Sequence, residues 1–342
     1  MHAYSTPREA FLDQIRGIAI LYVLAVHTFD FWFPGGGSGV GIFYGLSGYL
    51  TAARVLQVER FDWTEALKFW ARRIFRLYPA FIVAMLMIFL ILWRFLPDRV
   101  DLFLAAIPGL MFFRRPIDWE PLGIGVGILW SLRVEAFYYL ILPLAMVWGG
   151  RQRGLLGLCA VMMASSLISI LIGTDDPLGG GIWHWGGGLA LGSLAAYLER
   201  YNLAALGQVL KSRHFIWVLY AVLGLLLFLP QISSTVWWME VMLAAAVTSL
   251  LILAYMNHPS IRIVPGLPWI GRLAYCLYLI HGIVIDYMRP VLGLTKIEKI
   301  LFFIPITFGL SIMLNRLVEL PCIELGKRAM TRLTSSSVAR DR

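Results

Sequence analysis

Residues 11–31 read FLDQIRGIAILYVLAVHTFDF, an apolar segment that is long enough to cross a membrane and yet carries Arg16 and His27. A bilayer-spanning helix needs about 20 mostly apolar residues. The eleven steps from Arg16 to His27 turn a helix by ~1,100°, so both side chains share one face, about 16 Å apart along the axis. This face would offer a cation at one membrane surface and a titratable imidazole deep inside. The alternative is that Arg16 is a topological anchor and His27 a packed, hydrogen-bonded side chain.

The apolar character extends along the whole chain. Of its 342 residues, 59% are hydrophobic and 14% are charged, and the mean hydropathy is +0.76. Soluble domains average roughly 45–50% apolar and about 25% charged residues. The composition therefore predicts a multi-pass integral membrane protein. The net charge of +9 is attributed to basic cytoplasmic loops and not to nucleic-acid binding. The three widely spaced cysteines suggest neither a disulfide framework nor a metal site.

Ten apolar segments predict an all-α bundle of about ten transmembrane helices. Their expected ranges are 17–34, 39–56, 78–96, 122–148, 154–172, 182–198, 215–230, 236–256, 268–286 and 299–320. The short stretch 101–113 contains Pro108 and is predicted to be a re-entrant or interfacial piece.

The distribution of basic residues predicts the orientation of the bundle. With the N-terminus inside, 20 of the 29 Lys and Arg residues fall in cytoplasmic segments and 7 in outer loops. Cytoplasmic loops of membrane proteins carry such an excess. Both termini are therefore predicted to be cytoplasmic. The chain is expected to form one membrane domain, 1–342, with a core of about 11–325 and a basic tail at 326–342.

Ionisable residues inside apolar segments are the first functional candidates, because a charge at membrane depth costs about 2.5–3.5 kcal/mol on insertion scales. Glu135 lies near the middle of its segment, at about the depth of His27. General acid–base catalysis and proton coupling both fit such a carboxylate. The other residues of this kind are Asp30, Arg133, His281, Arg316 and Glu319. Arg316 and Glu319 are three residues apart, so they could simply pair with each other.

Two further patterns carry both a structural and a functional interpretation. The segment GVGIFYGLSGYL, residues 39–50, contains small residues that allow close helix approach. Arg73 and Arg76 fall in the cytoplasmic loop expected at 57–77 and share a helix face. Arginine forks bind phosphates well, and the alternative for this pair is topology with anionic-lipid contact.

Six motifs in order resemble those of acyltransferase family 3, membrane proteins that acylate cell-surface polysaccharides, lipopolysaccharide O-antigens and some secreted small molecules. The motifs are LDQIRGIAILYVLAVH (12–27), GVGIFYGLSGYL (39–50), RRIFRLYP (72–79), LWSLRVEAFYYLILP (129–143), YCLYLIH (275–281) and VELP (318–321). The resemblance covers about residues 11–325 and implies an O-acyltransferase of the bacterial cytoplasmic (inner) membrane.

The resemblance carries over to single positions. Arg16 and His27 match the family's arginine and histidine with ten residues between them, and Arg73 and Arg76 match its arginine pair. The family's serine–glycine–aromatic–leucine element corresponds to Ser47, Gly48, Tyr49 and Leu50, and its late histidine and glutamate correspond to His281 and Glu319. Its tryptophan–serine–leucine, valine–glutamate and tyrosine element corresponds to Trp130, Ser131, Leu132, Val134, Glu135 and Tyr138.

Two positions depart from the family's pattern. Gln14 replaces the usual glycine, and Ala136 stands where a second acidic residue is common, which leaves Glu135 as the only carboxylate there. Some family members carry a periplasmic hydrolase-like domain after the tenth span, and none is expected here. One-step transfer within the membrane domain is therefore the simpler expectation.

The resemblance implies an acyl-CoA donor, most often acetyl-CoA, on the cytoplasmic side, and no metal is expected. The acceptor is expected to be a carbohydrate, such as exopolysaccharide, lipopolysaccharide or a lipid-linked glycan, and a homo-oligomer is a further expectation. Arg16, Arg73 and Arg76 are expected to bind the donor's phosphates, and His27 to act as general base or transient acyl carrier. Glu135 is expected to orient His27, and Ser47 and Tyr138 to stabilise the oxyanion. The expected supporting residues are Asp13, Trp130, His281 and Glu319.

A proton-coupled transporter of acyl groups or of a polar solute is the alternative function. Its signature would also include His, Glu and Arg at mid-membrane. Transporters often show inverted repeats and interrupted helices, and the sequence shows no such symmetry. Release of CoA thiol in the presence of an acceptor would distinguish the enzyme from the transporter.

Overall fold

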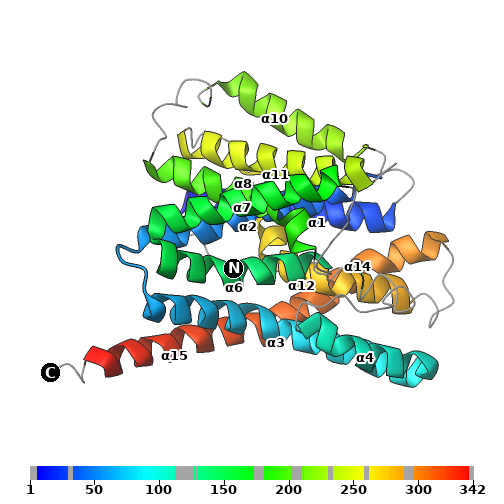
Figure 1. Cartoon of the computed structure of the whole chain (residues 1–342). Coiled ribbons are helices and arrows are strands. Elements are labelled where there is room, and N and C mark those ends of the chain that lie inside the picture. The colour runs from blue at the N-terminus through cyan, green and yellow to red at the C-terminus, as the bar shows by residue number, and fades with distance from the viewer. Residues whose placement is uncertain are drawn as a thin grey trace. The chain divides into compact units, whose positions relative to one another are not determined.

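The computed structural model describes residues 6–29, 34–111, 130–172, 181–201, 212–229, 234–257, 262–288 and 296–338, together with Gly127 and Leu210. Every regular element in these ranges is helical, as the all-α prediction requires (Figure 1). The elements are α1 (Pro7–Thr28), α2 (Gly37–Gln57), α3 (Trp63–Phe95), η1 (Pro97–Arg99), α4 (Val100–Met111), α6 (Trp130–Gly149), α7 (Arg151–Leu171), α8 (Ile182–Tyr201), α10 (Arg213–Leu226), α11 (Ser234–Asn257), α12 (Leu267–Ile283), η3 (Val284–Met288), α14 (Lys296–Leu314), η4 (Asn315–Glu319) and α15 (Leu320–Val338).

The predicted polytopic helical bundle is confirmed. Each of the ten predicted segments contains a helix, although the first residues of segment 122–148 lie outside the described ranges. Seven helical stretches in the described residues are long and apolar enough to cross a membrane. The short piece predicted near 101–113 is helix α4, which contains Pro108. The count of ten spans and the cytoplasmic placement of both ends stay predictions.

The chain folds into two compact units. Unit 1 comprises residues 1–60 and 130–274, and unit 2 comprises residues 61–129 and 275–342. The boundary falls inside α12, so the first part of this helix belongs to unit 1 and the rest to unit 2.

Helix α2 is the centre of unit 1, and its glycines explain why. A side chain at Gly41 would meet the backbone of Val241 on α11, and one at Gly48 would meet the backbone of Leu189 on α8. Gly39 faces α1 in the same way, at Ala19 and Val23. The predicted close packing of this segment is therefore confirmed. It brings the backbones of three helices against α2 and fixes where Ser47 lies.

A second close approach joins α1 to the start of α12, again within unit 1. A side chain at Gly17 would meet the backbone of Leu267, and one at Gly271 would meet the backbone of Asp13. The amide of Val264, just before α12, donates to the side-chain oxygen of Gln14 at 2.6 Å. Gln14, the departure from the family's glycine, is thus a structural tie between α1 and the segment that leads into α12.

Helix α3 is longer than predicted, and the expectation of a loop at 57–77 was wrong from Trp63 onward. Asp62 caps the helix, because its carboxylate accepts from the amide of Glu65 at 3.0 Å. The first turns are amphipathic and carry Arg72, Arg73 and Arg76, so they lack the continuous apolar run by which a span is recognised. Arg73 and Arg76 therefore lie on a regular helix.

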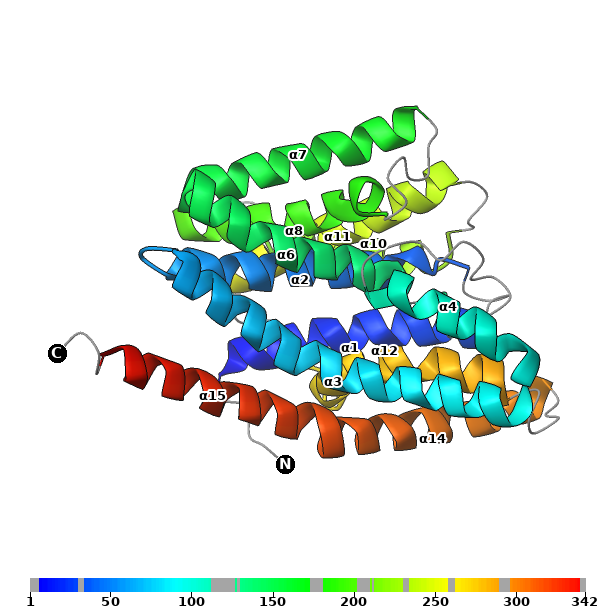
Figure 2. The same cartoon turned by 60° about the horizontal axis from the view of Figure 1, so that its bottom comes forward.

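In unit 2, α3 packs along a helix that continues from α14 through η4 into α15. Figures 1 and 2 both show α3 and α15 side by side. Gly326 of α15 lies on the ring of Phe75, where a side chain would collide with it. The helix continues to Val338, so most of the segment predicted as a basic tail is helical.

Arg316 and Glu319 both lie on a wide helical turn, η4 (Asn315–Glu319). This π-helical turn leaves Arg316 exposed and buries Glu319 to 4% exposure. The carboxylate of Glu319 accepts from the Asn315 amide at 2.8 Å and from the Cys276 thiol at 3.0 Å. The suggested pairing of Arg316 with Glu319 was therefore wrong, because the three-residue spacing assumed a regular α-helix.

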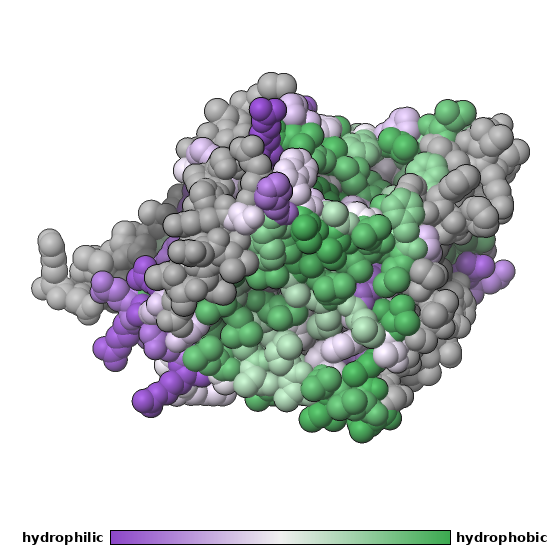
Figure 3. All heavy atoms as spheres, turned by 90° about the horizontal axis from the view of Figure 1, so that it is seen from above, coloured by the Kyte–Doolittle hydropathy of each residue, from purple (hydrophilic) through white to green (hydrophobic). Residues whose placement is uncertain are grey.

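Large apolar side chains remain exposed on the outer surfaces of the helices, as expected of lipid-facing residues. On α10 and α7 they include Trp217, Leu225 and Leu171, each more than three-fifths exposed. Figure 3 shows such a face, where apolar residues fill the middle and hydrophilic residues lie toward the edges.

Candidate active site

Glu135 is the centre of a polar network between α6 and α2, inside unit 1. Its carboxylate accepts hydrogen bonds from the hydroxyls of Ser47 on α2 and Tyr139 on α6. The Ser47 and Tyr139 hydroxyl oxygens are 2.7 Å apart. Ser47 and Glu135 come from distant parts of the sequence, and the fold of unit 1 places them together. The carboxylate is thus held by two hydroxyl donors in a largely apolar unit.

Tyr138 and Tyr139 differ in their partners. The hydroxyl of Tyr138 lies 2.6 Å from that of Ser193 on α8, and Ser193 in turn donates to the carbonyl of Leu189. Tyr138 is buried on this side of α6. Tyr139, which we did not predict, is the tyrosine that contacts Glu135. Its position four residues after Glu135 on one helix was a usable signal, since residues at this spacing share a face.

The two ends of the Arg16–His27 face lie in different surroundings. Arg16 is half-buried and forms an ion pair with Asp13, one turn earlier on α1. Asp13, predicted as a supporting residue, therefore neutralises Arg16 in this state. His27 lies in the last turn of α1 and is half-buried. Asp30 lies outside the described residues.

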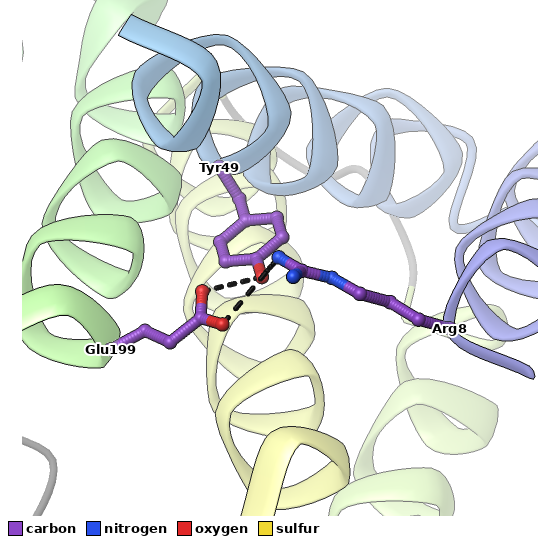
Figure 4. A network of polar contacts seen from close by, with 3 residues as sticks. All are labelled: Arg8, Tyr49 and Glu199. Atoms are coloured by element: carbon purple, nitrogen blue, oxygen red, sulfur yellow. Dashed lines mark hydrogen bonds and ion pairs between the residues drawn. The ribbon is translucent and has the colours of Figure 1, made fainter. Parts of the chain in front are cut away.

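A three-residue network joins α1, α2 and α8 near the start of α1 (Figure 4). The buried hydroxyl of Tyr49 donates to Glu199 at 2.6 Å and accepts from the Arg8 guanidinium at 2.6 Å. Arg8 and Glu199 also form an ion pair at 3.5 Å. Sequence reasoning matched Tyr49 to the family and singled out neither Arg8 nor Glu199. Arg8 and Glu199 lie near opposite ends of a long stretch of sequence, so no local sequence pattern connects them.

Glu240 is a fully buried carboxylate that we did not predict. Its Oε1 atom accepts from the amide of Ser38 at 2.5 Å and from the Ser38 hydroxyl at 2.7 Å. Ser38 is the second residue of α2, so Glu240 supplies an acceptor for a backbone N–H group that has no partner within the helix. The signal was present, because Glu240 lies within the apolar segment 236–256 and should have been included with the other intramembrane charges.

Trp130 belongs to an aromatic cluster at the same end of α2. Its ring centroid lies 5.2 Å from that of Trp185 on α8 and 5.4 Å from that of Trp237 on α11. Trp185 and Trp237 are 4.7 Å apart. We call these three residues the tryptophan cluster. His184 is buried beside it, with its ring centroid 4.4 Å from that of Trp185.

The remaining predicted site residues lie in unit 2. Arg73 and Arg76 are half-buried on α3, and the Arg73 guanidinium lies 5.4 Å from the ring centroid of Phe69. His281 is buried on α12, and its Nδ1 atom lies 3.1 Å from the carbonyl oxygen of Leu277. Glu319 is held by Asn315 and Cys276 as described above. In the described part of the chain, no three His, Cys, Asp or Glu residues gather closely enough to hold a metal ion.

Comparison with known proteins gives a consistent set of relatives. The family model of the acyltransferase domain, acyltransferase family 3, matches residues 9–316. The chain is 26% identical to the peptidoglycan O-acetyltransferase OatA of Listeria monocytogenes, over 93% of this chain and 56% of that protein. It is 29% identical to the putative peptidoglycan O-acetyltransferase YrhL of Bacillus subtilis, over 94% and 56%.

A third relative is a putative O-acetyltransferase of Staphylococcus aureus, 25% identical over 93% of this chain and 58% of that protein. The chain thus spans slightly more than half the length of these relatives. No solved structure matches the chain.

Proposed function

The chain belongs to acyltransferase family 3, and from this premise we propose that it moves an acetyl group from cytoplasmic acetyl-CoA to a hydroxyl of a cell-envelope carbohydrate. The family supports a membrane enzyme that transfers acyl groups. The names of the relatives, peptidoglycan O-acetyltransferases among them, support acetyl as the group and a glycan as the acceptor. The donor side and the acceptor class rest on the predicted topology and on the resemblance.

The observation that carries the proposal is the network of Glu135, Ser47 and Tyr139. A carboxylate inside an apolar helical unit is costly unless it is hydrogen-bonded. Here two hydroxyls from two helices hold it, and the packing of α2 against three neighbours keeps the Ser47 hydroxyl in place. A fixed anion of this kind stabilises an imidazolium that forms nearby, as the acidic member of a catalytic triad does.

We assign the proton transfer to His27. Its imidazole takes the proton of the acceptor hydroxyl while the oxygen attacks the thioester carbonyl carbon. The tetrahedral intermediate collapses, the carbon–sulfur bond breaks, and the CoA thiolate takes the proton back from the imidazolium. The products are the acetyl ester and free CoA, and the enzyme returns to its starting protonation state. Glu135 stabilises the imidazolium between these two transfers.

Counting protons changes the role proposed for Ser47. Ser47 and Tyr139 each have one hydroxyl proton, and both protons are directed at Glu135. Stabilising an oxyanion would require one of them to turn away and leave the carboxylate with a single donor. We therefore propose that Ser47 and Tyr139 orient Glu135, in place of the oxyanion role predicted for Ser47 and Tyr138.

The donor's phosphates are proposed to bind Arg73 and Arg76. Both side chains are half-buried and lie on a capped, regular helix, so their guanidinium groups are better ordered than those of a flexible loop. Arg16 is ion-paired with Asp13, so its contribution requires a phosphate to compete with that carboxylate. The arginine pair on α3 is therefore the stronger part of the proposed donor site.

The test is an assay of the purified full-length chain in lipid nanodiscs. Acetyl-CoA and a peptidoglycan-derived oligosaccharide are supplied, and both CoA thiol release and acetyl ester formation on the sugar are measured. We expect both products from the wild type and neither from His27→Ala, with Ser165→Ala as a control, since the Ser165 hydroxyl bonds only locally to Met162. Solute uptake into liposomes without thiol release would instead support the transporter.

A further inference from the structure

Short stretches of α2 and α6 connect the tryptophan cluster with the Glu135 network in unit 1. Trp130 precedes Glu135 by five residues on α6, which is about 7.5 Å along the helix axis. Tyr44, whose ring centroid lies 6.4 Å from that of Trp130, precedes Ser47 by three residues on α2. Both connections lead from the cluster to the network within one to two helical turns. A molecule held at the cluster would therefore lie within two helical turns of Ser47 and Glu135 along α2 and α6.

The cluster combines aromatic faces with an unsatisfied donor. Trp130 and Trp237 are half-buried, whereas Trp185, which packs against both of them, is 7% exposed. The indole N–H of Trp237 is buried and has no hydrogen-bond partner among the described residues. Buried donors are rarely left unpaired in proteins, so this one requires an explanation. An acceptor oxygen on a bound ligand would supply the missing partner.

The charge near the cluster indicates which ligand fits. Glu240 lies one turn after Trp237 on α11 and is fully buried. It accepts hydrogen bonds from Ser38, and the neighbouring residue Gly37 packs against the Trp237 ring. This carboxylate opposes an anionic ligand such as a nucleotide phosphate. A sugar ring has apolar C–H faces that pack on indole and hydroxyls that accept from an N–H. In the predicted topology, these ends of α2, α6, α8 and α11 also lie on the outer side, away from the donor.

We infer that the tryptophan cluster is the subsite that binds a sugar ring of the acceptor, with Trp237 as its specificity-determining residue. This inference rests on the proposed function, which makes the acceptor a glycan. It assigns the ring to the faces of Trp130 and Trp237 and one of its hydroxyl oxygens to the Trp237 N–H. The adjoining hydroxyl of the sugar then points along α6 toward Glu135.

The experiment measures binding and kinetics separately. Without any donor, a neutral peptidoglycan-derived oligosaccharide is titrated into the nanodisc-embedded protein while tryptophan fluorescence is recorded. We expect saturable quenching in the wild type and about tenfold weaker binding in Trp237→Leu. The variant loses a stacking contact, and a tenfold change in affinity corresponds to about 1.4 kcal/mol. Trp237→Phe keeps the ring and loses the N–H, so a smaller loss of affinity is expected. Trp217→Leu, a lipid-exposed tryptophan on α10, is the matched control and should bind like the wild type.

In the transfer assay, the acceptor KM should rise in Trp237→Leu while the KM for acetyl-CoA stays constant. Equal affinities of wild type, Trp237→Leu and Trp237→Phe for the oligosaccharide would overturn the inference. A rise in the acetyl-CoA KM alone would overturn it too, because the cluster would then bind the donor's adenine. If the wild type binds the sugar at the cluster and never transfers an acetyl group, the proposed function fails and the sugar site stands.

Discussion

The carboxylate of Glu240 and the amide of Ser38 lie 2.5 Å apart, and the Ser38 hydroxyl donates to the same oxygen at 2.7 Å. One buried anion on α11 therefore holds the first turn of α2, the helix that carries Ser47. Both residues are completely buried, so water cannot replace either partner. The position of α2 within unit 1 therefore depends on this pair.

Replacing Glu240 with alanine should destabilise the protein by about 3 kcal/mol, because two donors of Ser38 lose their acceptor in a buried site. Glu240→Gln keeps one acceptor oxygen and should cost less. Thermal unfolding in detergent, followed by tryptophan fluorescence, measures both. Glu324→Ala serves as the control, because Glu324 is half exposed and bridges only surface residues of α15. Equal melting temperatures for the Glu240 variants and the wild type would contradict the assigned role.

The two neighbouring tyrosines on α6 should differ in their effect on catalysis. Tyr139→Phe removes a donor to Glu135 and should lower kcat by about tenfold, since a hydrogen bond to a charged group is worth about 1.5–3 kcal/mol. Tyr138→Phe removes the contact with Ser193 and should affect stability more than kcat. Initial rates of CoA thiol release at saturating substrates make the comparison. A larger kcat loss in Tyr138→Phe would restore the original assignment of Tyr138.

Glycines at the centre of unit 1 should not tolerate even a methyl group. Gly48→Ala places a side chain against the backbone of Leu189, which cannot move without displacing α8. Overpacking of this kind typically costs about 1–3 kcal/mol. Gly157→Ala and Gly224→Ala provide matched controls on α7 and α10, where an added methyl meets open space. The yield of monodisperse protein after purification should fall for Gly48→Ala alone, and an undiminished yield would argue against the packing described.

Donor binding should depend on the arginine pair of α3 and not on His27. We expect Arg73→Ala/Arg76→Ala to lose acetyl-CoA binding in calorimetry and His27→Ala to retain it. Binding to the wild type should weaken with added salt, because phosphate contacts by exposed and half-buried arginines are screened. The control Arg60→Ala/Arg328→Ala removes the same number of positive charges at exposed positions. Loss of acetyl-CoA binding in this control would mean that the net charge of the protein, and not the arginine pair of α3, determines donor binding.

The sequence was sufficient for the helical bundle, because apolar segments of membrane length leave few alternatives. It was not sufficient for the start of α3, whose first turns carry Arg72, Arg73 and Arg76 and are recognised by amphipathic periodicity and the Asp62 cap. The grouping of Ser47 with Glu135 also needed the structure, since two helices must be placed before their hydroxyl and carboxylate can meet.

Other parts of the site were readable in principle. Glu240 was a charge in an apolar segment, like the residues that we did select, and Tyr139 followed Glu135 at helical spacing. The bond between Arg8 and Tyr49 and the one between Tyr49 and Glu199 join helices far apart in sequence. Local patterns carry no information on such pairs, and neither charge nor motif marked Glu199.

The pairing of α3 with α15 has a practical consequence for imaging. Helix α3 has 33 residues and is about 50 Å long, whereas the hydrocarbon layer is about 30 Å thick. Its capped first turns, braced by α15 where Gly326 meets Phe75, can therefore extend beyond the lipid as a rigid two-helix stalk. An antibody fragment raised against that stalk would give single-particle electron microscopy a rigid fiducial on unit 2.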